Sequence, residues 1–590
     1  MSDQFEDKPD TPPEPITQDT APDSITEDTL PEPFTQDTAP DSVAEDARPF
    51  SLEAETVSGS LTAASLGVDS SVLGRVVAVS GAQVSGVFRS AAAEGIQIGT
   101  LVKMPTPESH VFGMVSGLRI TDPALLGDEI EGIVDIELIC EAMDDGGEQI
   151  FQRGVSIYPM LGTELLATTA DELAQIYARP KESNVRIGTL YQDRNLPAYA
   201  ITDDLLGKHF SILGTTGSGK SCAVALILHA ILAEHPNGRI VLLDPHSEYA
   251  HAFEGMAEVI EPSNLHLPYW LLNFEESASV MVGSEGVERQ ADIAILKSAI
   301  LEAKKKYNTE RGPGDHITID TPVPYRYGDL VKIIDQAMGK FDKPDSSAPY
   351  LRLKTRLDAL RSDRRFAFMF SGVTIGDNMG EVLGRILRIP VSGRPVSIVD
   401  LSGVPSEIID AVVSVLCRMI FDFALWSARA RAFPVLLVCE EAHRYVSADK
   451  DVGFGPTRRS IARIAKEGRK YGVSLCLVSQ RPSELDSTIL SQCNTLFALR
   501  MSNERDHKFV HDAMPEGSMG LLSSLPSLKV QEAVVVGEGV TVPMRMRFDD
   551  LEPARRPRSA TASFSTCWQD DVDGDDIVAE TIERWRKQVR

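Results

Sequence analysis

The sequence GTTGSGKS, residues 214–221, lies between the short apolar run FSIL (210–213) and the longer run CAVALILHAILAEH (222–235). It fits the pattern G-x-x-x-x-G-K-[ST] of a phosphate-binding loop, which joins a strand to a helix. Its glycines allow a tight turn in which backbone N–H groups surround phosphate oxygens, and the helix N-terminus adds positive potential. An ordinary glycine-rich turn is the weaker interpretation, because the flanking runs read as the required strand and helix.

Within this loop the motif assigns separate tasks to two side chains. The Lys220 ammonium is expected to reach the β- and γ-phosphates, and the Ser221 hydroxyl is expected to bind Mg²⁺. We therefore predict ATP and Mg²⁺ as cofactors. The residues predicted to bind the nucleotide are Gly214, Thr215, Thr216, Gly217, Ser218, Gly219, Lys220, Ser221 and Cys222.

Apolar β-rich runs recur on both sides of the loop and are separated by helical stretches. The five runs are HFSILG, GRIVLLD, VSIVDLSG, PVLLVCEE and VSLCLVSQ. Strands that alternate with helices are typical of a parallel sheet covered on both faces. The sequence therefore predicts an α/β fold with the phosphate loop at the end of one strand.

Two adjacent carboxylates, Glu440 and Glu441, directly follow the buried strand in LLVCEEAHRY (436–445). An unpaired buried charge costs several kcal/mol, but a divalent cation and Lys220 would remove that cost. We expect this strand to be a neighbour of the phosphate-loop strand, with Glu440 in the Mg²⁺ shell and Glu441 polarising the attacking water. The alternative is a pair of surface carboxylates at a strand end.

Polar residues also end two other predicted strands. Gln480 follows VSLCLVS and lies where a γ-phosphate sensor would lie. In LLDPHSEY, Asp244 and Glu248 border either the nucleotide or a DNA path, and for Asp244 a capping role is equally consistent with the sequence.

A basic helical face follows the glutamate pair in TRRSIARIAKEGRKYG (457–472). Its cations recur at steps of four, three and four residues, which places them on one side of a helix. A neighbouring subunit can use such an arginine on the γ-phosphate, and we predict Arg469 first and Arg463 second. A solvated basic face is the alternative for most of these residues.

Composition divides the chain into four predicted regions. Residues 1–65 form an acidic tail that contains an 18-residue duplication and is expected to be disordered, and residues 66–165 have the short β-rich runs of a small barrel. Residues 166–548 are the predicted ATPase core, with a helical insertion at about 275–380 whose basic residues either touch phosphates or face solvent. A C-terminal extension covers 549–590.

Charge and cysteine content limit the class of protein. The net charge is −28, but residues 1–50 alone contain 14 acidic residues, so the remainder leaves room for local basic surfaces. The seven cysteines form no CxxC pair and mostly lie in apolar runs, which is typical of a reduced, cytoplasmic protein. No apolar run is long enough to span a membrane, so we expect no membrane insertion.

Six motifs in order resemble the HerA-like branch of the FtsK–HerA P-loop ATPases. They are HFSILGTTGSGKS, DPHSEY, VDLSGVP, EEAHRY, IAKEGRKYG and VSQRPSELD, and the resemblance runs from about 70 to 548. It implies a RecA-like core, a small N-terminal β-barrel, and a segment at 532–548 that packs on a neighbouring subunit. The sequence departs from the family at Ser247, where glycine is commoner, in the acidic tail, and in the extension from about 552.

The resemblance also implies an activity and partners. It implies a homohexameric ring that moves double-stranded DNA by ATP hydrolysis in end processing, repair or phage defence, often with a NurA-like nuclease. By position, Lys220, Ser221, Glu440, Glu441 and Gln480 match the family's ATPase residues, and Arg469 matches the region of its arginine finger. Two alternatives are a secretion or conjugation ATPase without a membrane segment, and a nucleotide-gated DNA clamp that activates an effector.

Overall fold

The structure is a computed structural model. It describes residues 72–89, 96–120, 131–145, 148–261, 264–282, 288–309, 316–340, 344–370, 376–402, 404, 406–427, 432–449, 453–513, 519–558, 564–569 and 574–587. The predicted acidic tail with its duplication lies outside these residues, and so do parts of the C-terminal extension.

The N-terminal described region is a small antiparallel β-barrel. Its strands are β1 (Val72–Ser80), β2 (Gln83–Arg89), β3 (Leu101–Pro105), β4 (Ser109–Ile120), β5 (Glu131–Asp145), β6 (Glu148–Arg153) and β7 (Glu164–Ala167). Six strands follow the order β2-β1-β7-β3-β4-β5 and close through β2–β5 pairing, and β6 pairs with β5 outside this ring. Alternate residues such as Val76, Met104 and Val111 fill the interior, as expected for a barrel. The predicted barrel is confirmed.

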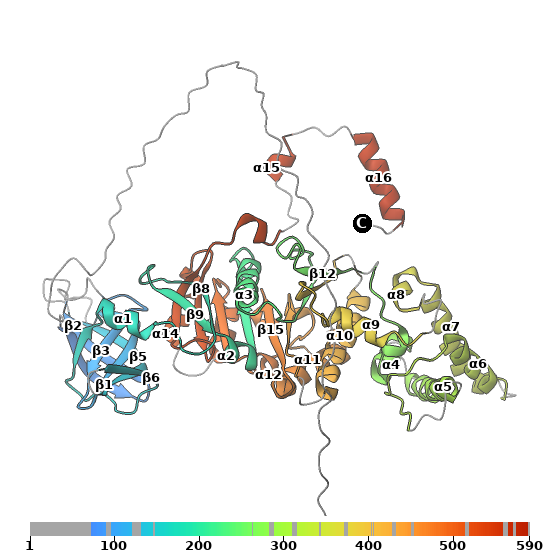
Figure 1. The fold of residues 1–590 in the computed structure, drawn as a ribbon, viewed down its shortest axis with the longest axis horizontal. Helices are drawn as coiled ribbons and strands as arrows, with labels where there is room; N and C mark the ends of the chain where they lie inside the picture. The colour runs from blue at the N-terminus through green and yellow to red at the C-terminus, as the bar shows by residue number, and fades with distance from the viewer. Residues whose placement is uncertain are drawn as a thin grey trace, which may run out of the picture. The chain divides into compact units, whose positions relative to one another are not determined.

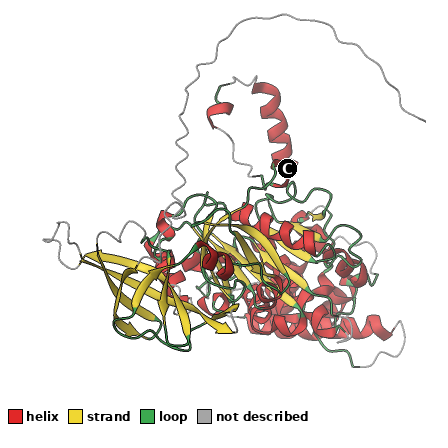
Figure 2. Cartoon of the chain, turned by 60° about the vertical axis from the view of Figure 1, so that its left-hand side comes forward, coloured by secondary structure: helices red, strands yellow, loops and turns green. Residues whose placement is uncertain are grey.

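The second sheet has eleven strands in the order β12-β13-β11-β14-β15-β10-β16-β17-β18-β8-β9. Pairing is parallel from β12 to β16 and antiparallel from β16 onward. The strands are β8 (Asn184–Leu190), β9 (Pro197–Ile201), β10 (Phe210–Leu213), β11 (Ile240–Asp244), β12 (Ala257–Ile260), β13 (Val396–Asp400), β14 (Val435–Cys439), β15 (Val473–Ser479), β16 (Thr495–Leu499), β17 (Glu532–Gly537) and β18 (Met544–Phe548). Figure 2 shows the strands of the two sheets as separate groups.

Helices cover both faces of this sheet (Figures 1 and 2). Helix α3 (Lys220–Glu234) connects β10 to β11, which takes the chain along the sheet toward β12. Helices α10 (Ser406–Trp426) and α11 (Gly455–Glu467) connect β13 to β14 and β14 to β15, which takes the chain in the opposite direction. Since such crossovers are right-handed, α3 lies on the face opposite to α10 and α11. The predicted α/β class is confirmed. The other helices outside the insertion are α1 (Ala170–Ile176), α2 (Thr202–Gly207), α12 (Ser487–Leu490), α13 (Glu504–Ala513), α14 (Met519–Leu522), α15 (Phe564–Cys567) and α16 (Gly574–Lys587).

One prediction about strand order is wrong. β10, which leads into the phosphate loop, and β14, which leads into Glu440, are not neighbours, because β15 pairs with both of them. All three strands are parallel, so their carboxyl ends still meet at one edge of the sheet. The predicted side chains therefore approach one another across the end of β15.

The predicted helical insertion consists of α4 (Phe274–Met281), α5 (Arg289–Thr309), α6 (Tyr327–Met338), α7 (Pro344–Ser362), α8 (Ala367–Phe370) and α9 (Met379–Ile386). The apolar faces expected from the sequence are buried, with Leu296 and Leu357 fully enclosed. The expectation for Lys304 is wrong, because this side chain is buried. Its ammonium donates to the carbonyls of Ile319 and Thr321, at 2.7 and 2.8 Å, instead of facing phosphate or solvent.

Residues 532–548, expected to pack on a neighbouring subunit, form β17 and β18 of the chain's own sheet. Residues such as Val534 and Met546 are buried within the chain. The apolar character of this segment therefore follows from its place in the sheet. A contact with a neighbouring subunit stays a prediction.

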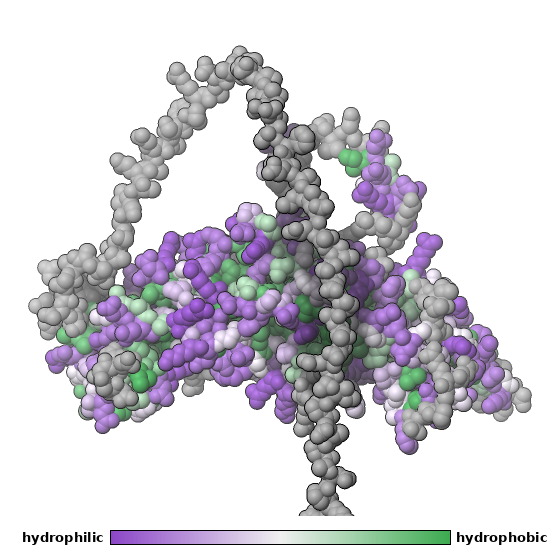
Figure 3. Space-filling model, in the orientation of Figure 1, coloured by the Kyte–Doolittle hydropathy of each residue, from purple (hydrophilic) through white to green (hydrophobic). Residues whose placement is uncertain are grey.

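The surface is mixed in character. On the face shown in Figure 3, apolar side chains are scattered among hydrophilic ones. Within the described parts of the chain, no helix combines the length and the apolar composition needed to cross a bilayer.

Candidate nucleotide-binding site

The phosphate loop leaves β10 between the ends of β15 and β16. Gly214 N–H donates to the Ser479 carbonyl at 3.3 Å, and Thr215 N–H donates to the Arg500 carbonyl at 2.9 Å. A Cβ on Gly214 would lie 2.8 Å from the Leu499 Cβ, so only glycine fits there. Gly219 has φ +102°, a left-handed conformation that opens helix α3 and turns the loop back on itself. These contacts hold the predicted loop at the sheet edge.

Lys220 and Glu440 are both buried at this edge, with exposed fractions of 8% and 4%. Burial lowers the pKa of the Lys220 ammonium, and the negative charge of Glu440 opposes this effect. Burial and the neighbouring Glu441 charge raise the pKa of the Glu440 carboxyl and Lys220 lowers it, with a net value of about 8. The structure therefore brings these two predicted residues together, although their strands are not adjacent.

Glu441 has a left-handed backbone, with φ 52° and ψ 45°, directly after β14. This conformation is uncommon for a residue other than glycine and is frequent at functional sites. Burial raises the pKa of its carboxyl. His443 Nδ1 lies 3.2 Å from Glu441 Oε2, but burial lowers the pKa of His443 to about 4, so the ring is neutral and this contact is not an ion pair.

The donor set fits a divalent cation with a triphosphate. Among the described residues, no group donates a hydrogen bond to one buried oxygen of each carboxylate, Oε2 of Glu440 and Oε2 of Glu441. Lys220 Nζ donates to the Thr215 carbonyl, at 3.1 Å, within the loop itself. In the described residues no group of three or more His, Cys, Asp or Glu side chains forms a complete metal site. Mg²⁺ is usually held by one or two protein ligands together with phosphate and water, and the two carboxylate oxygens named above fit this requirement.

Glu248, which the sequence left undecided, lies at the phosphate loop. Its Oε2 accepts a 2.8 Å hydrogen bond from the Ser221 hydroxyl, and its charge acts on both Lys220 and Glu440. Asp244 has the capping role that we considered, because its two oxygens accept the backbone N–H groups of His246 and Tyr249 at 3.2 and 3.0 Å. Glu248 therefore borders the predicted nucleotide site, and Asp244 caps the turn after β11 while its charge acts on Glu440.

Gln480, at the end of β15, lies beside the loop. Its Oε1 accepts a hydrogen bond from the Thr216 hydroxyl. The strand that separates β10 from β14 is thus followed by a polar residue that contacts the phosphate loop. This position supports a contact with the terminal phosphate, which stays a prediction.

The two candidate arginines lie elsewhere. Arg469 is exposed in the turn Gly468–Tyr471 before β15, close to His209, whose pKa is lowered by burial and also by the Arg469 charge. His209 lies directly before β10 and the phosphate loop lies directly after this strand, so they are at opposite edges of the sheet. Arg469, which is close to His209, is therefore at the edge opposite to its own phosphate loop. It cannot act on that loop within the same chain.

Arg463 is held by its own chain. Its guanidinium lies 4.2 Å from the centroid of the Phe421 ring and 3.4 Å from Asp422 Oδ1. Arg459, on the same predicted face, forms an ion pair with Glu275 of α4. These contacts make Arg463 the weaker of the two finger candidates.

Sequence comparisons identify relatives of this chain. Residues 185–420 match the family described as helicase HerA, central domain. The DNA double-strand break repair helicase HerA of Pyrococcus furiosus is 26% identical over 500 residues, which cover 79% of this chain and 84% of that protein. The protein of the same name from Sulfolobus acidocaldarius is 29% identical over 398 residues, covering 67% of this chain and 74% of that protein.

Solved structures with a similar fold include VirB4 of Thermoanaerobacter pseudethanolicus. It is 16% identical, has a TM-score of 0.46, and covers 64% of this chain and 98% of its own. The family match falls on the region that contains the phosphate loop, and the two HerA relatives extend over most of the chain. The chain is a P-loop ATPase whose sequence is similar to that of HerA helicases over most of its length.

Proposed function

We propose that this chain hydrolyses Mg²⁺-bound ATP and uses the reaction to move double-stranded DNA through a homohexameric ring. The observation that supports hydrolysis best is the pair of buried glutamates beside Lys220, each with an unsatisfied oxygen. A nucleotide switch that only binds would not need a second carboxylate next to the metal-binding one.

Each residue of the site has a chemical task in this proposal. Lys220 binds the β- and γ-phosphates, Ser221 and Glu440 hold the metal shell, and Glu441 accepts a proton from the attacking water. Gln480 contacts the γ-phosphate from the end of β15. When bound, Mg²⁺ neutralises phosphate charge and orients the transferred group.

Two different observations support DNA as the substrate and a ring as the assembly. Relatives that are named DNA double-strand break repair helicase cover most of the chain, which favours DNA as the track. Arg469 lies at the edge of the sheet remote from its own loop, which suits action on the loop of the next subunit in a ring. A NurA-like nuclease partner and a cytoplasmic location are further predictions from the family.

The decisive experiment measures ATPase activity with and without duplex DNA, together with displacement of a protein roadblock bound to that duplex. We expect DNA to stimulate ATPase activity and roadblock removal to require ATP. Glu441→Gln should bind ATP normally but lower turnover by about 10²–10⁴-fold. Stimulated hydrolysis without displacement would instead support the DNA clamp, and equal turnover of wild type and Glu441→Gln would refute the catalytic assignment.

A further inference from the structure

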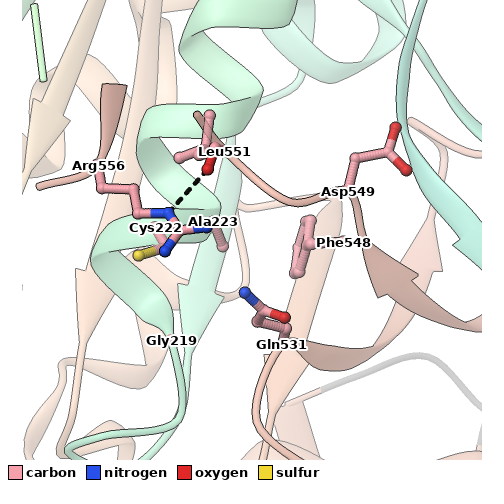
Figure 4. Close-up of a pocket in the computed structure, with 8 residues that line it drawn as sticks. All are labelled: Gly219, Cys222, Ala223, Gln531, Phe548, Asp549, Leu551 and Arg556. Carbon is pink, nitrogen blue, oxygen red and sulfur yellow. Dashed lines mark hydrogen bonds between the residues drawn. The ribbon is translucent and has the colours of Figure 1, made fainter. Parts of the chain in front are cut away.

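A pocket borders the phosphate loop at the first turn of α3, and the far C-terminal part of the chain forms its other wall. Gly219, Cys222 and Arg556 contribute one side, and Gln531, Phe548 and Asp549 contribute the other (Figure 4). Lys220, Gln480 and the two glutamates do not line this pocket. The pocket therefore lies next to the start of α3, apart from the side chains predicted to carry out hydrolysis.

Arg556 is fixed in place by the segment that carries it. Its Nε donates to the Leu551 carbonyl at 2.7 Å, and two residues further on Arg558 N–H donates to the Glu248 carbonyl at 2.9 Å. This segment follows the last strand of the sheet, so residues 551–558 cross next to the start of α3. In Figure 4 the guanidinium lies beside the Cys222 thiol, on the same side of the pocket as the helix.

Asp549 is an acidic side chain in the lining of this pocket, but its carboxylate pairs with Arg186, at 3.0 Å, rather than with Arg556. Among the described residues no carboxylate forms an ion pair with Arg556, and the N-terminus of α3 carries a partial positive charge of its own. Two positive groups beside one pocket are stable together when an electron-rich group lies between them. An aromatic ring is such a group, because the face of its π-system is negative.

An aromatic base would arrive at this pocket as part of the nucleotide. A triphosphate held by the loop has its γ-end at Lys220 and Glu440, so its α-phosphate and nucleoside point toward Cys222. The buried Phe548 ring provides apolar surface opposite the guanidinium, and its exposed fraction is 4%. The pocket thus has one planar cation and one aromatic side chain for a flat ligand.

We propose that Arg556 binds the nucleoside part of the nucleotide by covering the face of its base. The C-terminal segment 551–558 is then a part of the nucleotide site, although it lies more than three hundred residues after the phosphate loop in the sequence. This inference rests on the proposed function, since it needs a triphosphate in the loop.

The test compares two ligands that share the phosphates and differ in the nucleoside. Isothermal titration calorimetry in Mg²⁺ measures the Kd of a non-hydrolysable ATP analogue and of inorganic tripolyphosphate. Arg556→Ala is expected to weaken binding of the analogue about tenfold and to leave binding of tripolyphosphate unchanged. Arg556→Lys keeps the charge but loses the planar face, so it should resemble Arg556→Ala.

Control variants separate this inference from the proposed function. Arg555 is adjacent, lies 3.6 Å from Glu552 and does not line the pocket, so Arg555→Ala should change neither Kd. Lys220→Ala should weaken both ligands. If wild type binds neither ligand, the proposed function fails. If wild type binds both and Arg556→Ala changes neither Kd, or changes both equally, the nucleoside contact is refuted while the phosphate site stands.

Discussion

The Ser221 hydroxyl donates a hydrogen bond to Glu248 Oε2 at 2.8 Å. A hydroxyl has one proton and two lone pairs, so this bond leaves the lone pairs of Ser221 available for a cation. We therefore expect Glu248 to be a positioning residue that presents Ser221 to Mg²⁺. Its charge also lies close enough to act on Lys220 and Glu440.

Replacing Glu248 should weaken metal binding more than nucleotide binding. Loss of a group that orients a metal ligand typically lowers affinity about 10–100-fold. We expect Glu248→Ala to raise the Mg²⁺ concentration needed for half-maximal ATPase activity within that range, with little change in metal-free nucleotide affinity. Glu254→Ala, with an 83% exposed side chain nearby in the sequence, is the matched control. An unchanged Mg²⁺ requirement in Glu248→Ala would contradict the positioning role.

Glu440 should make the metal-free protein less stable as the pH rises. Burial raises the pKa of this carboxyl from 4.5 to about 8, so the folded state resists its ionisation. A group with a raised folded-state pKa favours the folded state while it is protonated, and this contribution is lost as the pH rises from about 4.5 to about 8.

The measurement is the Tm in a chelator across this pH range for wild type and Glu440→Gln. The neutral amide should remove much of the loss, so the variant should be the more stable protein at pH 8. Added Mg²⁺ and an ATP analogue should stabilise wild type and have little effect on Glu440→Gln. A variant that is less stable than wild type at pH 8 without metal would argue against a strained, unpaired carboxylate.

Ser247 has a backbone conformation that favours glycine. Its φ is +57°, a conformation that costs a residue with a side chain about 1–2 kcal/mol. Its hydroxyl donates to Asp400 Oδ2 at 2.6 Å, which offsets that cost.

Two substitutions separate the backbone from the hydrogen bond. Ser247→Ala keeps the strained backbone and loses the bond, so it should lower the free energy of unfolding by about 1.5–3 kcal/mol. Ser247→Gly loses the same bond but relieves the strain, so its loss should be smaller. The comparison uses denaturant unfolding of both variants, and equal losses would mean that the backbone conformation carries no strain.

Arg469 should act on the phosphate loop of a neighbouring subunit. Arg469→Ala and Glu441→Gln proteins are each expected to be inactive alone. Mixed rings should recover part of the ATPase activity, because some interfaces pair an intact Arg469 with an intact Glu441. Arg463→Ala is the comparison, since loss of its contacts with Phe421 and Asp422 should lower stability and leave most of the activity. No recovery at any mixing ratio would count against action between subunits.

Much of this site was predictable because its signals are local in the sequence. The motif GTTGSGKS between a predicted strand and a predicted helix indicates the phosphate loop. Two adjacent acidic residues after an apolar strand indicate the roles of Glu440 and Glu441. The sequence also predicts Gln480 at the phosphate edge, since parallel strands end at one edge, and its side chain accepts a hydrogen bond from Thr216 of the loop. These predictions needed only the position in the sequence at which each strand ends and its loop begins.

What the sequence did not reveal depends on contacts between distant segments. The position of β15 between β10 and β14 is a property of strand order, which short motifs do not encode. Glu248 reaches Ser221 because the turn at Ser247 has a positive φ, and Lys304 is buried because two carbonyls receive its ammonium. Arg556 is separated from the loop by most of the core.

The central claim is that Mg²⁺ and a triphosphate are held across the end of β15, between the loop after β10 and the glutamates after β14. Cryo-electron microscopy of the protein with Mg²⁺, a slowly hydrolysed ATP analogue and duplex DNA tests this most directly. We predict γ-phosphate density within hydrogen-bond distance of Lys220 Nζ, and metal density between Ser221 Oγ and the Glu440 carboxylate. Nucleotide bound with Glu440 and Ser221 both remote from the metal and the phosphates would contradict the account.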